Sequence, residues 1–473
     1  MSAISTLTRE LPAGSWTTNA DAIAPHLVEW RDRYRGASPV LLTPRSTGEV
    51  SRMVRLCASL GLSVVPQGGN TGLVGGQTPR GDLGGVLLSL RKMNAIRKVN
   101  PVTDSLVAEA GATLASVQRA AAEVARKFPL SLASEGSATV GGLISTNAGG
   151  VHVLRYGTTR ALVFGVEAVL ADGRVFDGLT SLRKDNTGYD LSNLFVGAEG
   201  TLGIVTAASL KLFAVPGHVQ RAMVGVESAE AALRLLEGAR ATGRLALFEV
   251  MPRIGLEMVL AHIPGQRDPF GEAYPWYVLA DWEADGAAEG EALAEAVLGK
   301  ALEAGLARDA VVAQSDAQAA ALLALREHLS EAQKYEGGSI KQDITVPLDR
   351  IPEFLARANA AVEGLVPGAR PVAFGHFGDG NIHYNVSQPR KEGMGADRDG
   401  FLARWQDVSE AVFDIVDALG GSISAEHGIG VMKRDDLAAR ADPVKLAMMR
   451  RIKDALDPAG TMNPRVLFSE KGS

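Results

Sequence analysis

The sequence has one cysteine, no long basic run and no long apolar run, and each shortage excludes a class of protein. Because Cys57 is alone, the chain has neither a disulfide framework nor a cysteine-ligated cluster, and a reducing cytoplasm is its expected location. A net charge of -6 without a basic run argues against a nucleic-acid partner. No apolar stretch approaches the roughly 18 residues of a membrane span, and the first residues do not resemble a signal peptide. We therefore expect a water-soluble protein.

Glycine, by contrast, is abundant, with 53 residues in 473, above the usual share of about 7%. Ten of them lie in two segments, Pro66–Pro79 (PQGGNTGLVGGQTP) and Ser134–Gly150 (SEGSATVGGLISTNAGG). Backbone this rich in glycine can turn several N–H groups toward one concavity, which suits a phosphate or pyrophosphate. The spacing is neither that of a Rossmann fingerprint nor that of a nucleoside-triphosphatase loop. The pair predicts a long ligand held at two places, and simple turns are the alternative.

The order of apolar and helical segments predicts the domains. Residues 1–38 are expected to be a helical lead-in, with an amphipathic helix over 21–34. A β-α-β rhythm over 39–216 predicts one α+β domain, and 217–425 is expected to form a second α+β domain. Residues 426–473 are expected to pack back toward the first domain.

Two histidines flank a predicted turn. Val372–Val386 (VAFGHFGDGNIHYNV) predicts two short strands joined by a two-residue turn at Asp379–Gly380. With that turn His376 lies directly opposite His383, close enough for both imidazoles to bind one metal ion. Because side chains alternate along a strand, Asn385 is expected on the same face as His383. A hydrogen-bonded histidine pair inside a core is the alternative.

A third ligand and a base are offered by Ser424–Gly430 (SAEHGIG). Neighbouring residues on a straight strand point to opposite faces, so Glu426 and His427 cannot both bind a metal unless the chain bends. The simpler arrangement has Glu426 as the third ligand and His427 beside the metal as the base, a role that suits an imidazole pKa. The alternative is that Glu426 and His427 are an unrelated pair of residues on the surface.

These motifs resemble a known flavoprotein superfamily, that of vanillyl-alcohol oxidase and p-cresol methylhydroxylase. Its FAD-binding domain is similar to the two glycine-rich segments and to RYG at 155–157. GHFGDGNIHYNV and SAEHGIG resemble its D-2-hydroxyacid dehydrogenase branch, above all the D-2-hydroxyglutarate dehydrogenases. The resemblance spans nearly the whole chain. It implies an α+β fold with a two-part FAD-binding domain of the vanillyl-alcohol oxidase type and an antiparallel-sheet substrate (cap) domain with helices.

The resemblance also implies which residues contact FAD. They belong to both glycine-rich segments and to two later positions, and they are Gln67, Gly68, Gly69, Asn70, Thr71, Gly72, Leu73, Gln77, Gly136, Thr139, Gly142, Asn147, Gly149, Gly150, Tyr156, Ile204 and Val205. Many members attach the flavin through a histidine in the first segment. This chain has Asn70 there and no histidine between 66 and 79, so we predict non-covalent FAD.

By the same resemblance, His376, His383 and Glu426 bind a divalent metal, zinc or else manganese. His427 is the base that takes the proton of the substrate hydroxyl, while hydride passes from C2 to flavin N5. Asn385 contacts the metal or the substrate.

Substrate contacts carry over as well. Arg326, the hydroxyl of Ser330 four residues later and Lys341 match positions that bind the substrate in D-2-hydroxyglutarate dehydrogenases, although Ser330 stands where those have threonine. Two cations favour a dicarboxylate. Taken alone, Arg326 and Lys341 are typical of solvated surface residues.

The predicted reaction is oxidation of a D-2-hydroxy acid, D-2-hydroxyglutarate first, to the 2-oxo acid. D-lactate or glycolate dehydrogenase is the competing reading within the branch, and a flavin-carrying electron-transfer subunit is the reading from another class. The resemblance suggests a homodimer that passes electrons to a quinone or an electron-transfer flavoprotein.

Overall fold

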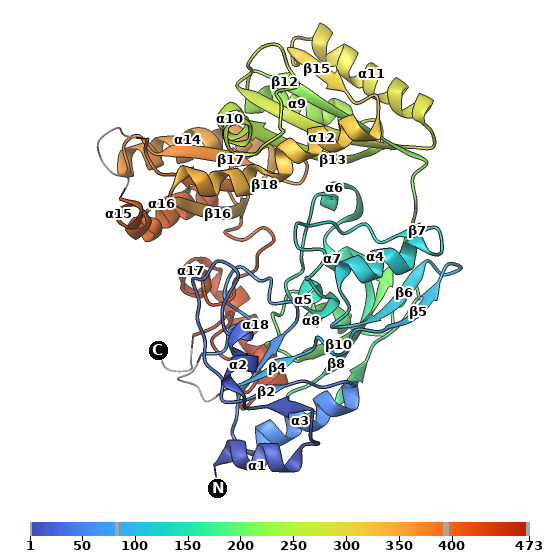
Figure 1. Ribbon diagram of the computed structural model, residues 1–473, viewed down its shortest axis with the longest axis vertical. Coiled ribbons are helices and arrows are strands. Elements are labelled where there is room, and N and C mark those ends of the chain that lie inside the picture. The colour runs from blue at the N-terminus through green and yellow to red at the C-terminus, as the bar shows by residue number, and fades with distance from the viewer. Residues whose placement is uncertain (1, 81–84, 391–396, 470–473) are drawn as a thin grey trace. The chain divides into compact units, whose positions relative to one another are not determined.

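The computed structural model describes residues 2–80, 85–390 and 397–469. The chain forms two compact units, each built from several segments (Figure 1). The first comprises Met1–Gly150, Tyr156–Val215 and Glu426–Ser473, and the second Val151–Arg155 and Pro216–Ala425. Each unit combines helices with sheets, so the expected α+β class is confirmed.

A small four-stranded sheet in the first unit positions the first glycine-rich segment. Its order is β1-β2-β4-β3, and its strands are β1 (Trp16–Thr17), β2 (Leu41–Leu42), β3 (Val64–Gln67) and β4 (Val86–Ser89). β4 pairs in parallel with both β2 and β3, and helix α3 (Thr47–Ser59) crosses between β2 and β3. Apolar residues at helical spacing bury one face of α3, namely Val50, Met53, Val54 and Cys57. The glycine-rich segment begins where β3 ends.

An antiparallel five-stranded sheet of order β5-β6-β10-β8-β9 forms the other part of the first unit. Its strands are β5 (Ile96–Asn100), β6 (Ser105–Glu109), β8 (Val163–Val169), β9 (Val175–Asp177) and β10 (Ile204–Lys211). Helices α4 (Leu114–Ala122) and α5 (Val140–Ser145) pack against β6, β8 and β10 in one apolar core. Helix α18 (Pro443–Leu456) adds Ile452 and Leu456 to this core.

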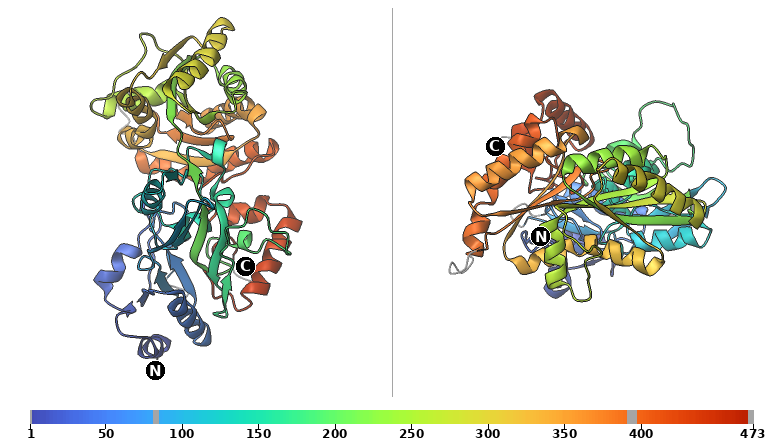
Figure 2. Two further views of the ribbon diagram at one scale, coloured as in Figure 1. Left: turned by 90° about the vertical axis from the view of Figure 1, so that its right-hand side faces the viewer. Right: turned by 90° about the horizontal axis from the view of Figure 1, so that it is seen from above.

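The second unit contains two antiparallel sheets. The larger has the order β13-β14-β12-β15 and consists of β12 (His218–Val226), β13 (Leu245–Pro252), β14 (Trp276–Ala284) and β15 (Asp309–Val312). Helices lie on both of its faces, α9 (Ala229–Arg240) and α11 (Ala287–Glu303) with one core, α10 (Arg253–His262) and α12 (Asp316–Glu327) with another (Figure 2). The smaller sheet, β16-β18-β17, contains β16 (Ser339–Thr345), β17 (Arg370–Phe374) and β18 (Asn381–Ser387).

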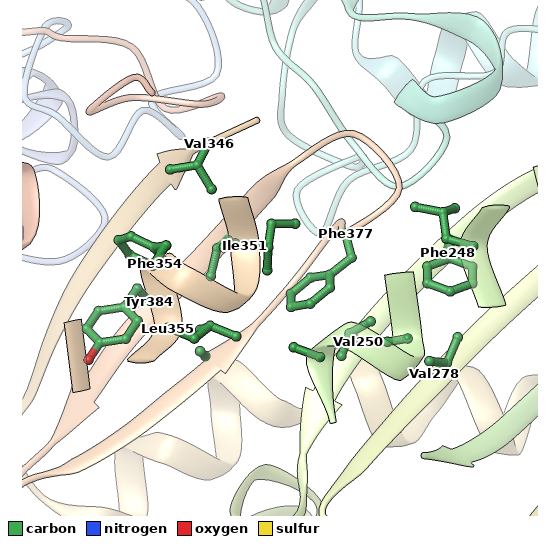
Figure 3. Close-up of a cluster of buried hydrophobic side chains, with 14 of the residues drawn as sticks. Phe248, Val250, Val278, Val346, Ile351, Phe354, Leu355, Phe377 and Tyr384 are labelled. Carbon is green, nitrogen blue, oxygen red and sulfur yellow. The ribbon is translucent and has the colours of Figure 1, made fainter. Parts of the chain in front are cut away.

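One continuous apolar core joins the two sheets of the second unit. Phe248 and Val250 of β13 share it with Phe377, Tyr384 of β18, and residues of helix α14 (Ile351–Leu365) (Figure 3). Helix α16 (Trp405–Ala418) packs on α14 and β16. Because both sheets pack on the same core, the side chains at the edges of the two sheets keep fixed positions relative to one another.

The helix expected over residues 21–34 is wrong beyond its first turns. Helix α2 covers only Ala20–Ile23, and a 3₁₀ turn over Ala24–His26 follows. Val28 and Arg35 then form an antiparallel bridge around Asp32, whose φ is 55°. Apolar residues do recur at helical spacing in this segment. The chain nevertheless turns back on itself, because the N–H of Glu29 donates to the carbonyl of Tyr34 at 3.0 Å.

Among the described residues, no helix combines the length and the apolar character needed to cross a membrane.

Candidate active site

The two glycine-rich segments touch in the first unit. A Cβ atom added at Gly69 would lie 1.9 Å from the carbonyl oxygen of Ser137, and one added at Gly68 would lie 2.2 Å from Thr139 Oγ1. Such distances are far below van der Waals contact, so only glycine allows this approach. The two segments that are expected to hold one ligand are therefore neighbours in the first unit.

Most of the predicted FAD residues lie around this contact. Gln67 is the last residue of β3, and those from Gly68 to Leu73 follow the strand. Gly136 and Thr139 precede α5, Gly142 lies in α5, and Asn147, Gly149 and Gly150 follow it. Gln67 and Gln77 act inside the first segment: Gln67 donates to the carbonyl of Gln77 at 3.1 Å, and Gln77 donates to that of Gly72 at 2.8 Å. These two side chains hold the shape of the loop.

The last three predicted FAD residues lie outside the two glycine-rich segments. Tyr156, at the end of helix α6 (Val153–Tyr156), packs edge-on against Phe213 at 4.8 Å. Ile204 and Val205 begin β10, and their side chains are buried in apolar cores. Only the backbone of Ile204 and Val205 can therefore offer polar contacts.

The predicted two-residue turn at Asp379–Gly380 is wrong. In the β17–β18 pair Phe374, not His376, lies opposite His383, and the connecting loop covers residues 375–380. Gly375, with a φ of 137°, leaves the pair and exchanges two backbone hydrogen bonds of 3.0 Å with Val250 of β13. The other sheet of the unit thus competes for this backbone and ends the hairpin early.

The two histidine rings nevertheless come together. The ring centroids of His376 and His383 are 5.3 Å apart, with an interplanar angle of 77°. His376 reaches this position from the loop rather than from the strand. The ring of Phe374 lies 5.2 Å from that of His383 and closes one side of the pair.

A carboxylate missed by sequence reasoning lies beneath His376. Glu249 is the single ionisable residue of β13 (LALFEVMP), whose eight residues are all buried. Its Oε1 accepts a hydrogen bond from His376 Nδ1, and its Oε2 accepts one from Arg326 Nε at 2.6 Å. Burial alone would raise the pKa of Glu249, but Arg326 and His376 outweigh it and lower the pKa to about 2. In the sequence, Glu249 could have been found as the single charged residue of an otherwise apolar strand.

A second missed carboxylate, Asp343, belongs to β16. It lies opposite His383 in the β16–β18 register, with 3.7 Å between its Oδ1 and His383 Nδ1. The same oxygen accepts a hydrogen bond from Asn381 Nδ2 at 3.0 Å. The next pair on this face is Lys341 opposite Asn385, two of the predicted substrate residues.

The predicted clamp residues on the helices are separated. Arg326 lies near the end of α12, is largely buried, and its guanidinium covers the ring of Phe374 at 4.7 Å. Ser330 lies in the next short helix, α13 (Leu329–Ala332), and is exposed. The structure brings Arg326 to the histidine pair but gives Ser330 no such neighbour in the contacts described.

Glu426 and His427 follow directly on Ala425, whose N–H donates to the carbonyl of Asp343 at 3.4 Å. Ligand atoms of His376, His383 and Glu426 all lie within 4.8 Å of one another, and so do those of Asp343, Glu426 and His427. Two imidazoles and a carboxylate are a donor set that suits zinc.

The turn after His427 is held by a carboxylate of the first unit, also missed in the sequence. Glu199 accepts hydrogen bonds of 2.8 Å from the N–H groups of both Ile429 and Gly430. Burial raises the pKa of Glu199 to about 7, although these N–H groups and nearby Lys433 act in the opposite direction.

Comparison with known families decides the assignment. Residues 38–178 match the model of the FAD binding domain, and 215–467 match that of the FAD linked oxidases, C-terminal domain. The chain belongs to the FAD-linked oxidases. The expected resemblance is confirmed for the FAD-binding domain and for the D-2-hydroxyglutarate dehydrogenases, and this FAD-linked oxidase is an FAD-dependent dehydrogenase.

Relatives and solved structures extend over nearly all of this FAD-linked oxidase. D-2-hydroxyglutarate dehydrogenase, mitochondrial, of Bos taurus is 39% identical, covering 98% of this chain and 82% of the relative. D-2-hydroxyglutarate dehydrogenase of Xanthomonas citri pv. viticola is 37% identical, covering 98% and 96%. The structure of p-cresol methylhydroxylase with substrate bound shares the fold, with a TM-score of 0.76 at 18% identity, covering 98% of this chain and 95% of the other.

The site of this FAD-linked oxidase fits its cofactor. Among the residues the structure describes, Thr139 Oγ1 and Asn70 Oδ1 are buried without a hydrogen-bond partner. Burying such atoms unpaired costs free energy, so their presence in the two glycine-rich segments fits a polar ligand at this place, as FAD would be.

Replacing Gly69 with alanine is expected to expel FAD, because the new Cβ would force the two segments apart. The affinity for FAD should fall on the order of tenfold or more, measured by flavin absorbance after gel filtration and by titration of the apoprotein. Gly48→Ala is the control: in α3 its Cβ would meet only Ser46 Oγ, at 3.9 Å. Equal FAD binding by the Gly69 variant would contradict the proposed contact.

Replacing Glu199 with glutamine is expected to remove a pH dependence of stability. Between its ordinary pKa of 4.5 and about 7, folded Glu199 keeps a proton that the unfolded chain has released, so this group's contribution falls as pH rises. The loss is on the order of 3 kcal/mol and is complete slightly above the folded pKa.

Urea unfolding of both proteins between about pH 5 and about pH 8 would measure this effect. The difference in unfolding free energy should move in favour of Glu199→Gln as the pH rises. Glu123→Gln removes an exposed carboxylate of the same unit and serves as the control. A difference independent of pH would contradict the prediction.

Proposed function

We propose that the protein oxidises a D-2-hydroxy acid, in the first place D-2-hydroxyglutarate, to the 2-oxo acid with non-covalent FAD and a divalent metal. The observation that carries the proposal is the grouping of His376, His383 and Glu426 beside Arg326, a cation suited to a carboxylate. The names of the relatives supply the substrate.

FAD, when bound, accepts hydride at N5 and so supplies the oxidation. The chain's part is to hold the cofactor with the two glycine-rich segments and the polar atoms buried between them. Asn70 stands where many members carry the histidine that binds flavin covalently, which supports a non-covalent cofactor.

A divalent metal, when bound, lowers the pKa of a hydroxyl on it. His376, His383 and Glu426 would hold it, and this donor set suits zinc, with manganese as the alternative. Asn385 would lie on the same strand face as His383 toward the metal or the substrate.

His427 would take the proton from the C2 hydroxyl. An imidazole can accept a proton near neutral pH, and the backbone after His427 is fixed by Glu199. The proton goes to His427 and the hydride leaves C2, so the alcohol loses two electrons and two hydrogens and becomes a ketone.

Arg326 and Lys341 would bind the carboxylates. Glu249 takes the Nε–H of Arg326, which leaves both terminal nitrogens to face an acid bidentately. Two cations favour a dicarboxylate over lactate or glycolate, and Ser330 would keep the hydroxyl of the clamp. The family resemblance further supports a homodimer and a quinone or electron-transfer flavoprotein as electron acceptor. The single cysteine supports a reducing cytoplasm as the location.

Anaerobic bleaching of the flavin tests the reaction and ranks the substrates. We expect D-2-hydroxyglutarate to reduce the flavin fastest. D-2-hydroxyglutarate and D-malate should both act faster than D-lactate and glycolate, because only these two acids have two carboxylates to match two cations. Faster reduction by D-lactate or glycolate would favour the competing dehydrogenases. A FAD-replete protein that no 2-hydroxy acid bleaches would instead be an electron-transfer subunit.

Replacing His427 with alanine should slow flavin reduction by about 10²- to 10⁴-fold while FAD stays bound, since the proton would lose its acceptor. Stopped-flow absorbance under anaerobic conditions measures the rate, and the flavin spectrum reports the cofactor. His218→Ala, at the start of β12, controls for loss of any histidine. Reduction at the wild-type rate would refute the role of His427.

A further inference from the structure

Glu249 is a charged residue in a strand that is buried from solvent. All eight residues of β13 are buried, and the other seven carry no ionisable side chain. Burying a carboxylate costs free energy unless close partners compensate it, and losing one partner leaves an uncompensated charge. Glu249 has two partners, one for each oxygen, and they belong to different parts of the proposed site: His376 and Arg326.

The backbone places His376 over Glu249 independently of the side chains. Gly375, just before His376, exchanges two hydrogen bonds of 3.0 Å with Val250. Gly378, just after it, donates to the carbonyl of Phe248 at 3.2 Å. The loop is therefore docked on β13 at the residues on either side of Glu249.

The hydrogen bond from Glu249 determines which nitrogen His376 can offer. Because Nδ1 faces the carboxylate, Nε2 is the nitrogen that can bind a metal. A carboxylate partner of this kind fixes the tautomer and the ring orientation of a metal-binding histidine and strengthens it as a ligand. The rings of His376 and His383 meet edge to face, with 5.3 Å between their centroids.

The other oxygen fixes Arg326. Its Nε lies 2.6 Å from Glu249 Oε2, and its Cζ lies over the ring of Phe374, 4.7 Å from the ring centroid. A planar group held by a hydrogen bond and by an aromatic ring has little freedom left, so its terminal nitrogens point in a set direction. Phe374 in turn lies opposite His383 in the strand pair.

We propose that Glu249 is a positioning residue that sets the metal ligand His376 and the carboxylate clamp Arg326 in one geometry, so that metal affinity and substrate affinity depend on the same side chain. The inference rests on the proposed function. It goes beyond a stabilising ion pair, because removing the charge should alter two separate affinities.

The test compares Glu249→Gln with a matched control, Glu336→Gln. Glu336 is another largely buried carboxylate of the second unit that binds a histidine and an arginine, His262 at 2.7 Å and Arg370 at 2.6 Å. Both substitutions remove the charge of a carboxylate that binds a histidine and an arginine. Glu336 is less buried than Glu249 and also binds Arg390 at 2.8 Å. Only Glu249 touches residues of the proposed site, so a merely structural effect would appear in both variants.

Zinc affinity is measured directly by competition with a chromophoric chelator on the FAD-loaded protein, without reference to turnover. For Glu249→Gln we expect about 10- to 100-fold weaker zinc binding, with FAD content unchanged. With zinc added to saturation, KM for D-2-hydroxyglutarate should remain raised by about tenfold, because Arg326 is still released from its position. Glu336→Gln should leave zinc affinity and KM at the wild-type values.

Glu249→Asp provides the conservative variant. It keeps the charge on a shorter side chain, so zinc affinity and KM should lie between those of the wild type and Glu249→Gln. It also allows the same comparison should the glutamine variant not fold. Wild-type zinc affinity and KM in a folded Glu249 variant would overturn the proposal.

Failure of the proposed function gives a different result. In that case the wild-type protein itself would not bind one equivalent of zinc, or no 2-hydroxy acid would reduce its flavin. A wild type that binds zinc and oxidises the acid, together with a Glu249→Gln variant that does both equally well, refutes only the role of Glu249.

Discussion

The carboxylate of Glu249 has to be neutralised inside an apolar strand, and the polar geometry of the second unit follows from how this is done. Its oxygens draw in His376 and Arg326, and the backbone bonds of Val250 and Phe248 hold the loop that carries His376. His383 and Asp343 meet this group from the smaller sheet. One buried charge thus relates a loop, a helix and two sheets to one another.

The first unit is organised by close approach rather than by charge. Gly68 and Gly69 let the first glycine-rich segment touch the second, and any side chain there would separate them. Glu199 is the counterpart of Glu249 in this unit: its carboxylate binds two backbone N–H groups just after His427. In both units a carboxylate distant in the sequence fixes a residue that the proposed chemistry uses.

The sequence was sufficient for the class of fold, the family and the cofactor, because glycine spacing and histidine motifs are local patterns. It could not predict the loop over residues 375–380. Asp379–Gly380 is by itself a good two-residue turn, and only the pairing of Gly375 with Val250 of β13 prevents the hairpin from reaching it. Glu249, Asp343 and Glu199 were missed for the same reason: each acts on residues far along the chain, and no local spacing reveals such a pair. The helix expected at 21–34 failed where a bridge between Val28 and Arg35 replaced it.

X-ray absorption spectroscopy at the zinc edge, on protein loaded with FAD and one equivalent of zinc, tests the central claim most directly. The account predicts a first shell of nitrogen and oxygen atoms at about 2.0–2.1 Å, with the multiple scattering of two imidazole rings. That scattering should fall to one ring in a His376→Ala variant. Zinc without imidazole scattering, or a spectrum unchanged by the substitution, would contradict the account.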